Sequence, residues 1–303
     1  MEQFRAITVR NLRLYFRDKG SIFFSLLSMI IVIGLMVFFL GDMNIDAITE
    51  LLGQFPGRDA AADADNARRL VLAWTCAGIL SINAVTVTLA VYSVMIKDRV
   101  NGKLGSIYTS PVSRLAITAG YIAAAWVASL IMCILTLAIS ELYGMVKGLE
   151  VYSLMTHIRL LGMIMVNSFT YAAFMYLIAL IAKTEGAWNG IGTVVGTLVG
   201  FLGGIYIPIG TLSNTVGKIM KCTPVLYGTA MFRNVMTSDI VDTTFAGVPE
   251  DVIQEYRKVM GISLSVGGHG LEMMEELLIL LVCGILFLSI GVWVLTHSKK
   301  TDR

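Results

Sequence analysis

The segment 97–114 holds the densest group of residues that could bind a partner. It is short and net basic, and it separates two long apolar runs that contain no Asp, Glu, Lys or Arg. The charged side chains of this segment can bind a partner by ion pairing and hydrogen bonding. We expect a short helix over 100–108, ended by Ser110-Pro111, because the residue before a proline avoids the helical conformation. The charges are Lys97, Asp98, Arg99, Lys103 and Arg114.

Several motifs that the chain lacks narrow its function. It has no Gly-x-x-x-x-Gly-Lys-Ser/Thr, so we do not expect it to hydrolyse ATP. It has no His-Glu-x-x-His or zinc spacing, and nothing predicts nucleic-acid binding. No acid lies in a predicted span, which argues against an ion-coupled transporter and an intramembrane protease. We expect a non-enzymatic chain, without a metal or cofactor of its own, that moves or holds something with energy from elsewhere.

The composition is typical of a membrane protein. Hydrophobic residues make up 56% of the chain and charged residues 15%, against roughly 25% charged in soluble domains; the mean hydropathy is +0.76. A span needs roughly 20 apolar residues. Six stretches qualify, which predicts an all-α integral membrane protein with a single transmembrane domain over 1–303. The predicted spans are about 21–41, 70–96, 115–140, 160–182, 187–210 and 277–296.

Residues 1–20 have the pattern of an amphipathic helix. Arg10, Arg13 and Arg17 follow the spacing i, i+3, i+7 and share one face. Phe4 and Leu14 lie on the opposite face. We expect this helix to lie in the membrane interface, with its arginines among lipid phosphates.

The distribution of basic residues predicts the orientation. More than half of the 23 Lys and Arg residues lie in four pieces that make up less than a third of the residues outside the predicted spans: 1–20, 97–114, 183–189 and 297–303. Basic loops stay in the cytoplasm. We therefore expect a multi-pass protein of the cell (inner or plasma) membrane, with both termini cytoplasmic.

Polar side chains inside the predicted spans have two interpretations. They can hydrogen-bond to neighbouring helices, each worth ~0.6 kcal/mol on average, or they can line a substrate path. Asn83 is the best candidate for a path, because its amide has the most hydrogen bonds to satisfy. The candidate path residues are Asn83, Thr86, Asn167 and Thr197.

The predicted fifth span carries a glycine at every fourth position. The four residues are Gly192, Gly196, Gly200 and Gly204. A small residue every four positions lets another helix approach closely. Packing within one subunit and a seam between two subunits both remain open.

The chain after this span is broken by glycine and proline. Gly203-Gly204 and Pro208 come first, and Pro224 follows. Such an interrupted apolar stretch predicts a segment that re-enters the membrane boundary, within an extracellular region over 211–276. Pro249 and Gly261 bracket a predicted external helix.

These residues resemble the permease subunits of type-2 ABC exporters, over nearly the whole chain. One stretch similar to the family pattern is Asp98-Arg99-x-x-Gly102-x-Leu104-x-x-Ile107-x-x-Ser110-Pro111. The others are Gly203-Gly204-Ile205-Tyr206-Ile207-Pro208, then Thr223-Pro224-Val225-Leu226-Tyr227, and Arg233. The stretch 237–276 is longer than the simplest members have.

The resemblance implies a mechanism. Two permease subunits, identical or different, pair in the lipid membrane, and each docks a cytoplasmic ABC ATPase that holds ATP and Mg. The helix within 97–114 would be the coupling helix, and Asp98 and Arg99 would pair with the ATPase or the N-terminal helix. Gly102 would permit close approach, and Pro111 would fix the end of the loop. The segment 203–227 would form an outer gate.

The sequence indicates the substrate only as a broad chemical class. Uncharged spans favour an amphipathic or lipid-like substrate, such as a drug, a peptide or a lipid-linked molecule. One alternative is a membrane scaffold or sensor that binds a cytoplasmic partner through 97–114 without transport. A passive pore is a weaker alternative.

Overall fold

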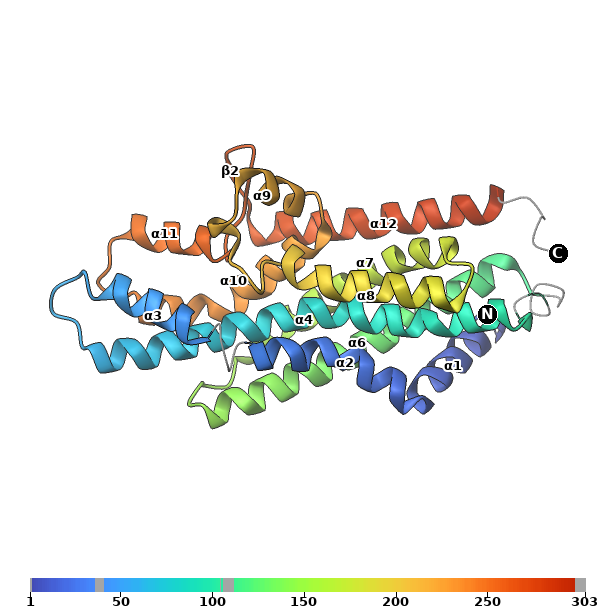
Figure 1. Ribbon diagram of the computed structural model, residues 1–303, viewed down its shortest axis with the longest axis horizontal. Helices are drawn as coiled ribbons and strands as arrows, with labels where there is room; N and C mark the ends of the chain where they lie inside the picture. Colours follow the sequence, from blue (N-terminus) through green and yellow to red (C-terminus); the bar gives the residue numbers. More distant parts are fainter. Residues whose placement is uncertain (1, 36–40, 104, 106–111, 298–303) are drawn as a thin grey trace.

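The bundle is built around one helix that is about twice as long as the apolar core of a membrane is thick. The computed structural model describes residues 2–35, 41–103, 105 and 112–297 (Figure 1). Helix α4, Ala60–Val100, has 41 residues, which is about 60 Å against an apolar core of ~30 Å. The elements that pack on it are α1, α2, α3, α6, α7, α8 and α10.

Among the described residues, four helices are long and apolar enough to cross a membrane: α4, α6 (Arg114–Val146), α7 (Leu154–Ile181) and α12 (Met273–His297). They correspond to four of the six predicted spans. Helices α2 (Lys19–Leu35) and α8 (Glu185–Leu202) occupy the other two predicted spans, with 17 and 18 residues, but do not reach that combination of length and hydropathy. The count of six spans stays a prediction.

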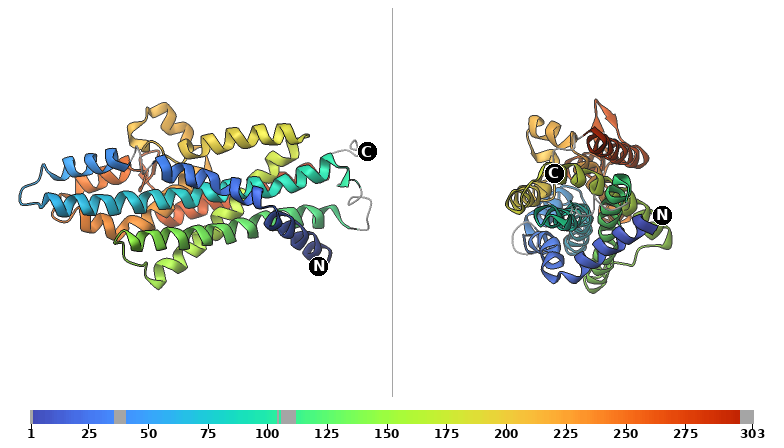
Figure 2. Two further views of the ribbon diagram at one scale, coloured as in Figure 1. Left: turned by 60° about the horizontal axis from the view of Figure 1, so that its bottom comes forward. Right: turned by 90° about the vertical axis from the view of Figure 1, so that its right-hand side faces the viewer.

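The start of α1 and the end of α12 lie at the end of the bundle where α4 ends and α6 begins (Figures 1 and 2). We call this the loop end and the opposite one the far end. Helix α1, Glu2–Arg17, packs on α6, where Gly120 leaves room for the Ile7 side chain. Figure 2 shows α1 inclined to the long axis of the bundle. The amphipathic N-terminal helix is therefore present, and Phe4 and Leu14 stay exposed on it.

The far end is a packed group of helices. Helix α3, Gly41–Leu52, packs beside the start of α4 and buries Ile48 and Leu52. Helices α10, Pro224–Thr244, and α11, Glu250–Val259, complete the group (Figure 1). Burying apolar side chains provides the driving force for this packing. The helix predicted between Pro249 and Gly261 is confirmed as α11.

Short helices and strands connect the long helices between α8 and α12. The turn helix η2, Ile209–Thr211, and helix α9, Asn214–Lys221, lie between α8 and α10. The strands β1, Ser265–Val266, and β2, His269–Gly270, form an antiparallel hairpin before α12. Gly267 and Gly268 have positive φ angles at its turn, a conformation that glycine adopts without steric cost.

Glycines on α6, α10 and α12 lie closer to side chains of neighbouring helices than the glycines on α8 do. An added Cβ at Gly284 would meet the Phe169 ring at 2.9 Å, and one at Gly291 would meet Tyr176 at 2.9 Å. On α8, Gly196 has no neighbour within 4 Å. Gly204 follows the helix, in a turn with φ +62°. The predicted four-glycine face is therefore wrong at Gly204, because the backbone leaves the helix at Gly203.

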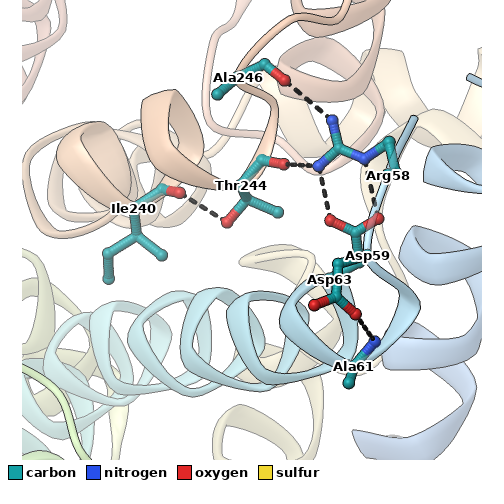
Figure 3. A network of polar contacts seen from close by, with 7 residues as sticks. All are labelled: Arg58, Asp59, Ala61, Asp63, Ile240, Thr244 and Ala246. Atoms are coloured by element: carbon teal, nitrogen blue, oxygen red, sulfur yellow. Dashed lines mark hydrogen bonds and ion pairs between the residues drawn. The ribbon is translucent and has the colours of Figure 1, made fainter. Parts of the chain in front are cut away.

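Arg58 links the start of α4 to the end of α10 by hydrogen bonds (Figure 3). Its Nε and Nη2 atoms donate to the two carboxylate oxygens of Asp63, at 2.8 and 2.7 Å. Its guanidinium also donates to the carbonyls of Thr244 and Ala246, at 2.7 and 2.9 Å. The hydrogen bonds to Asp63 raise the pKa of Arg58. This arginine thus binds the last carbonyl of α10 and one carbonyl of the turn that follows, while it pairs with α4.

We expect Arg58→Ala to lower the free energy of unfolding by about 2 kcal/mol, because it leaves a buried Asp63 carboxylate without its partner. Denaturant unfolding of the purified protein in detergent measures the change. Arg68→Ala is the matched control, since Arg68 is exposed on α4 and its loss should shift stability by less than about 0.5 kcal/mol. Equal effects of the two substitutions would contradict the role of Arg58.

Candidate coupling site and transport path

Asp98 joins three helices at the loop end. It lies in the last turn of α4 and is only 4% exposed. Arg10 of α1 donates to both of its carboxylate oxygens, each at 2.7 Å. Tyr121 of α6 donates its hydroxyl to Oδ2 at 2.6 Å. Asp98 therefore has hydrogen-bond partners on both α1 and α6.

The electrostatics of this pair depend on burial. The Arg10 side chain is 35% exposed and that of Asp98 is 6% exposed. The hydrogen bonds to Asp98 raise the pKa of Arg10. A bidentate arginine–carboxylate pair is among the stronger polar contacts in proteins. Of the three arginines predicted to share a face, Arg10 turns to Asp98, whereas Arg13 and Arg17 remain exposed.

The residues on either side of Asp98 connect α4 to two further helices. Arg99 donates through Nη1 to the carbonyls of Ala179 and Ala182, at 2.9 and 2.5 Å. Those carbonyls end α7, where a cation is favourable. Lys97 lies 3.5 Å from Asp18, which caps α2 through hydrogen bonds from Ser21 that lower its pKa. Three successive residues thus bind three different parts of the bundle.

The structure describes the base of the 97–114 loop and little beyond it. Asn101 and Gly102 form the turn after α4, and Gly102 has φ +70° with no neighbour within 4 Å of an added Cβ. Ser113 caps α6 by accepting a hydrogen bond from the Ala116 amide at 3.2 Å. The predicted coupling residues Leu104, Ile107, Ser110 and Pro111 lie outside the described residues, as does most of the predicted helix.

Arg233 of α10 hydrogen-bonds to two turns of the chain, one after α8 and one after α11. It is fully buried, and its guanidinium carbon lies 3.9 Å from the centre of the Trp74 ring on α4. It donates to the Gly204 carbonyl at 2.9 Å and to the Met260 carbonyl at 3.2 Å. Trp74 donates to the same Met260 carbonyl at 2.8 Å. Burial lowers the pKa of Arg233 to about 9, so the group still carries its charge at pH 7.

Among the predicted outer-gate residues, Gly204 contacts Arg233 directly. Gly203 caps α8, and the Tyr206 ring folds back against Gly200. Pro208 precedes η2, and Pro224 begins α10. Tyr227 donates to the Lys221 carbonyl at 2.7 Å. The segment 203–227 is therefore a chain of turns and short helices, and its re-entry into the membrane stays a prediction.

One comparison identifies the family of this chain. A family model described as ABC-2 family transporter protein matches residues 59–293. The chain belongs to this family. It is thus a multi-pass membrane permease component of an ABC transporter, a class that works with an ABC ATPase and is generally not catalytic itself. A comparison with curated proteins gives no match.

Hydrogen bonds within or between helices engage three of the four candidate path residues of the permease. Asn83 donates to the Met132 carbonyl at 3.2 Å and to Thr136 at 2.6 Å, both on α6, which favours a role in helix packing. Thr86 donates back to the Asn83 carbonyl at 3.3 Å. Thr197 is exposed on α8 and donates to the carbonyl of Thr193.

Asn167 of the permease differs from the other three candidates. It is 1% exposed, and neither atom of its amide has a hydrogen-bond partner among the described residues. Its Oδ1 lies 2.5 Å from the position of an added Cβ at Gly228. A buried amide without partners costs free energy, so Asn167 is the candidate that best fits a role in a second conformation or with a bound molecule.

Two residues of these sites carried no assignment from the sequence. Tyr121 looks like any aromatic residue near the start of an apolar run, and only the packing of α6 on α4 brings it to Asp98. Trp74 had one available signal, because an indole N–H in an apolar segment needs an acceptor.

Proposed function

We propose that this permease is the transmembrane subunit of an ATP-driven exporter. In this proposal a separate ABC ATPase, which holds ATP and Mg, docks on the 97–114 loop, and two permease subunits pair in the membrane. An amphipathic or lipid-like substrate moves outward by alternating access. The observation that carries the proposal is the set of contacts at Lys97, Asp98 and Arg99, because it links the base of the loop to four other helices.

The proposed route of coupling follows α4. Asp98 and Trp74 lie on this one helix, 24 positions and about 36 Å apart. A displacement of the loop by the ATPase would move the loop end of α4 together with α1, α6 and α7. The same helix carries Trp74 against Arg233, which holds the turn at Gly204. Movement at the ATPase would thereby reach the predicted outer gate.

Co-purification tests the proposal. The tagged chain is expressed in its native host, and the proteins that remain bound in mild detergent are identified. We expect an ABC ATPase in stoichiometric amount, and its loss in Lys103→Glu, which reverses an exposed charge in the loop. Lys147→Glu is the control, exposed in the α6–α7 connection. A preparation without ATPase, even after crosslinking, would favour the scaffold or sensor.

Gly102 offers a sharper test of the loop. A valine there is strained by about 1–2 kcal/mol because of the positive φ, whereas asparagine tolerates that conformation. We expect Gly102→Val to abolish substrate-stimulated ATPase activity in the reconstituted complex while membrane insertion is unchanged. Gly102→Asn should keep the activity if the turn alone matters, and should lose it if the ATPase approaches the glycine closely. Full activity of Gly102→Val would overturn the coupling role of this loop.

A further inference from the structure

A basic cavity lies where α9 meets the chain that follows α11. Its volume is about 340 Å³. Lys218, Lys221 and Lys258 line it together with serine and asparagine side chains, and no acidic residue is among the described residues that surround it. Three cations without a carboxylate between them attract an anion.

The polar groups around this cavity retain free donors. Lys221 donates to the Ser265 carbonyl at 2.6 Å, which uses one of the three protons of an ammonium group. Lys218 and Lys258 are exposed, and their side chains make no hydrogen bond or ion pair within the described ranges of the chain. The first turn of α9 also faces the cavity, and its Ser213 cap makes no side-chain hydrogen bond. Backbone amides at a helix start add to the attraction of an anion.

Helix α9 places the cavity at the level of lipid head groups. The residues of α9 that line the cavity are Asn214, Gly217, Lys218 and Lys221, and this i, i+3, i+4, i+7 spacing puts them on one face. Val216 and Ile219 are exposed on the other face. An amphipathic helix of this kind lies in a membrane interface. Lys221 of α9 donates to Ser265 in the hairpin that directly precedes α12 along the chain, and the apolar stretch of α12 starts at Met273.

We propose that this cavity binds the phosphate group of an anionic lipid, with Lys218, Lys221 and Lys258 as its cationic ligands. In the orientation of the proposed function, the lipid belongs to the outer leaflet. The bound head group would hold α9 against the hairpin of β1 and β2, next to the Gly204 turn. The site is separate from the loop end, so its failure would leave the docking of an ATPase untouched.

Lipid retention by the purified full-length permease tests this site. Native mass spectrometry in mild detergent is carried out with added dioleoylphosphatidylglycerol or dioleoylphosphatidylcholine. We expect phosphatidylglycerol to be retained in preference to phosphatidylcholine, and Lys218→Gln/Lys258→Gln to weaken its retention by about tenfold. Lys147→Gln should bind like the unaltered chain. Both lysines of the double variant are exposed, and an unchanged thermal midpoint would show that the fold is retained.

Three outcomes would overturn the proposal. The first is equal retention of the two lipids, and the second is equal retention of phosphatidylglycerol by the unaltered chain and the double variant. The third concerns the source of the phosphate. If inorganic phosphate displaces the lipid at a comparable concentration, the cavity is a site for a soluble anion and the lipid assignment is wrong.

Discussion

Arg233→Leu is expected to lower the free energy of unfolding by about 3 kcal/mol. The substitution removes two charge-assisted hydrogen bonds and leaves the buried Gly204 carbonyl without this donor, while the Met260 carbonyl keeps its hydrogen bond from Trp74. It also removes the guanidinium that stacks on Trp74, a contact worth about 2 kcal/mol when it is desolvated. Burial of the apolar leucine side chain recovers only part of the free energy that is lost with these contacts. Denaturant unfolding in detergent, followed by tryptophan fluorescence, measures the loss.

Two further variants separate charge from geometry at this position. Arg233→Lys keeps a cation but lacks the planar fork that reaches two carbonyls at once, so we expect an intermediate loss. Arg159→Leu removes an exposed arginine and should change stability by less than about 0.5 kcal/mol. If Arg233→Leu were as stable as the unaltered chain, the two turns would not depend on this anchor.

Asp98→Asn is expected to cost about 2–3 kcal/mol and to loosen α1 from the bundle. Breaking a buried pair by neutralising one partner leaves Arg10 without its counter-charge, although Arg10 is partly exposed and water recovers some of the loss. Limited proteolysis at the N-terminal helix reports the loosening. In the proposed exporter, the same substitution would uncouple ATP hydrolysis from transport, because the base of the loop would no longer carry α1 and α6.

A double-mutant cycle isolates this pair. Arg10→Gln alone should resemble Asp98→Asn, and the two together should cost little more than either, with an interaction energy of at least about 1 kcal/mol. Arg13→Gln is the matched control, since Arg13 lies exposed on the same helix. Strict additivity of the two substitutions would show that the Arg10–Asp98 contact adds nothing to the fold.

Local sequence patterns predicted most of the long helices and the family of this protein. The long apolar runs predicted the helices α4, α6, α7 and α12, because hydropathy over about 20 residues is a property of adjacent residues. Pro249 and Gly261 marked α11 for the same reason. The stretches around Asp98 and Gly203 were sufficient to indicate the family that the comparison then showed.

Only the tertiary structure decided which side chains meet. Arg10 and Asp98 are 88 positions apart, and the relative rotation of α1 and α4 determines whether they face each other. The same holds for Arg233, which reaches a turn after α8 and another after α11. The glycine spacing of 192–204 continues past the point where the helix ends, while close approaches to another helix occur at Gly120, Gly228, Gly284 and Gly291. Spacing along a sequence fixes the face of a helix, but packing between distant helices decides what covers that face.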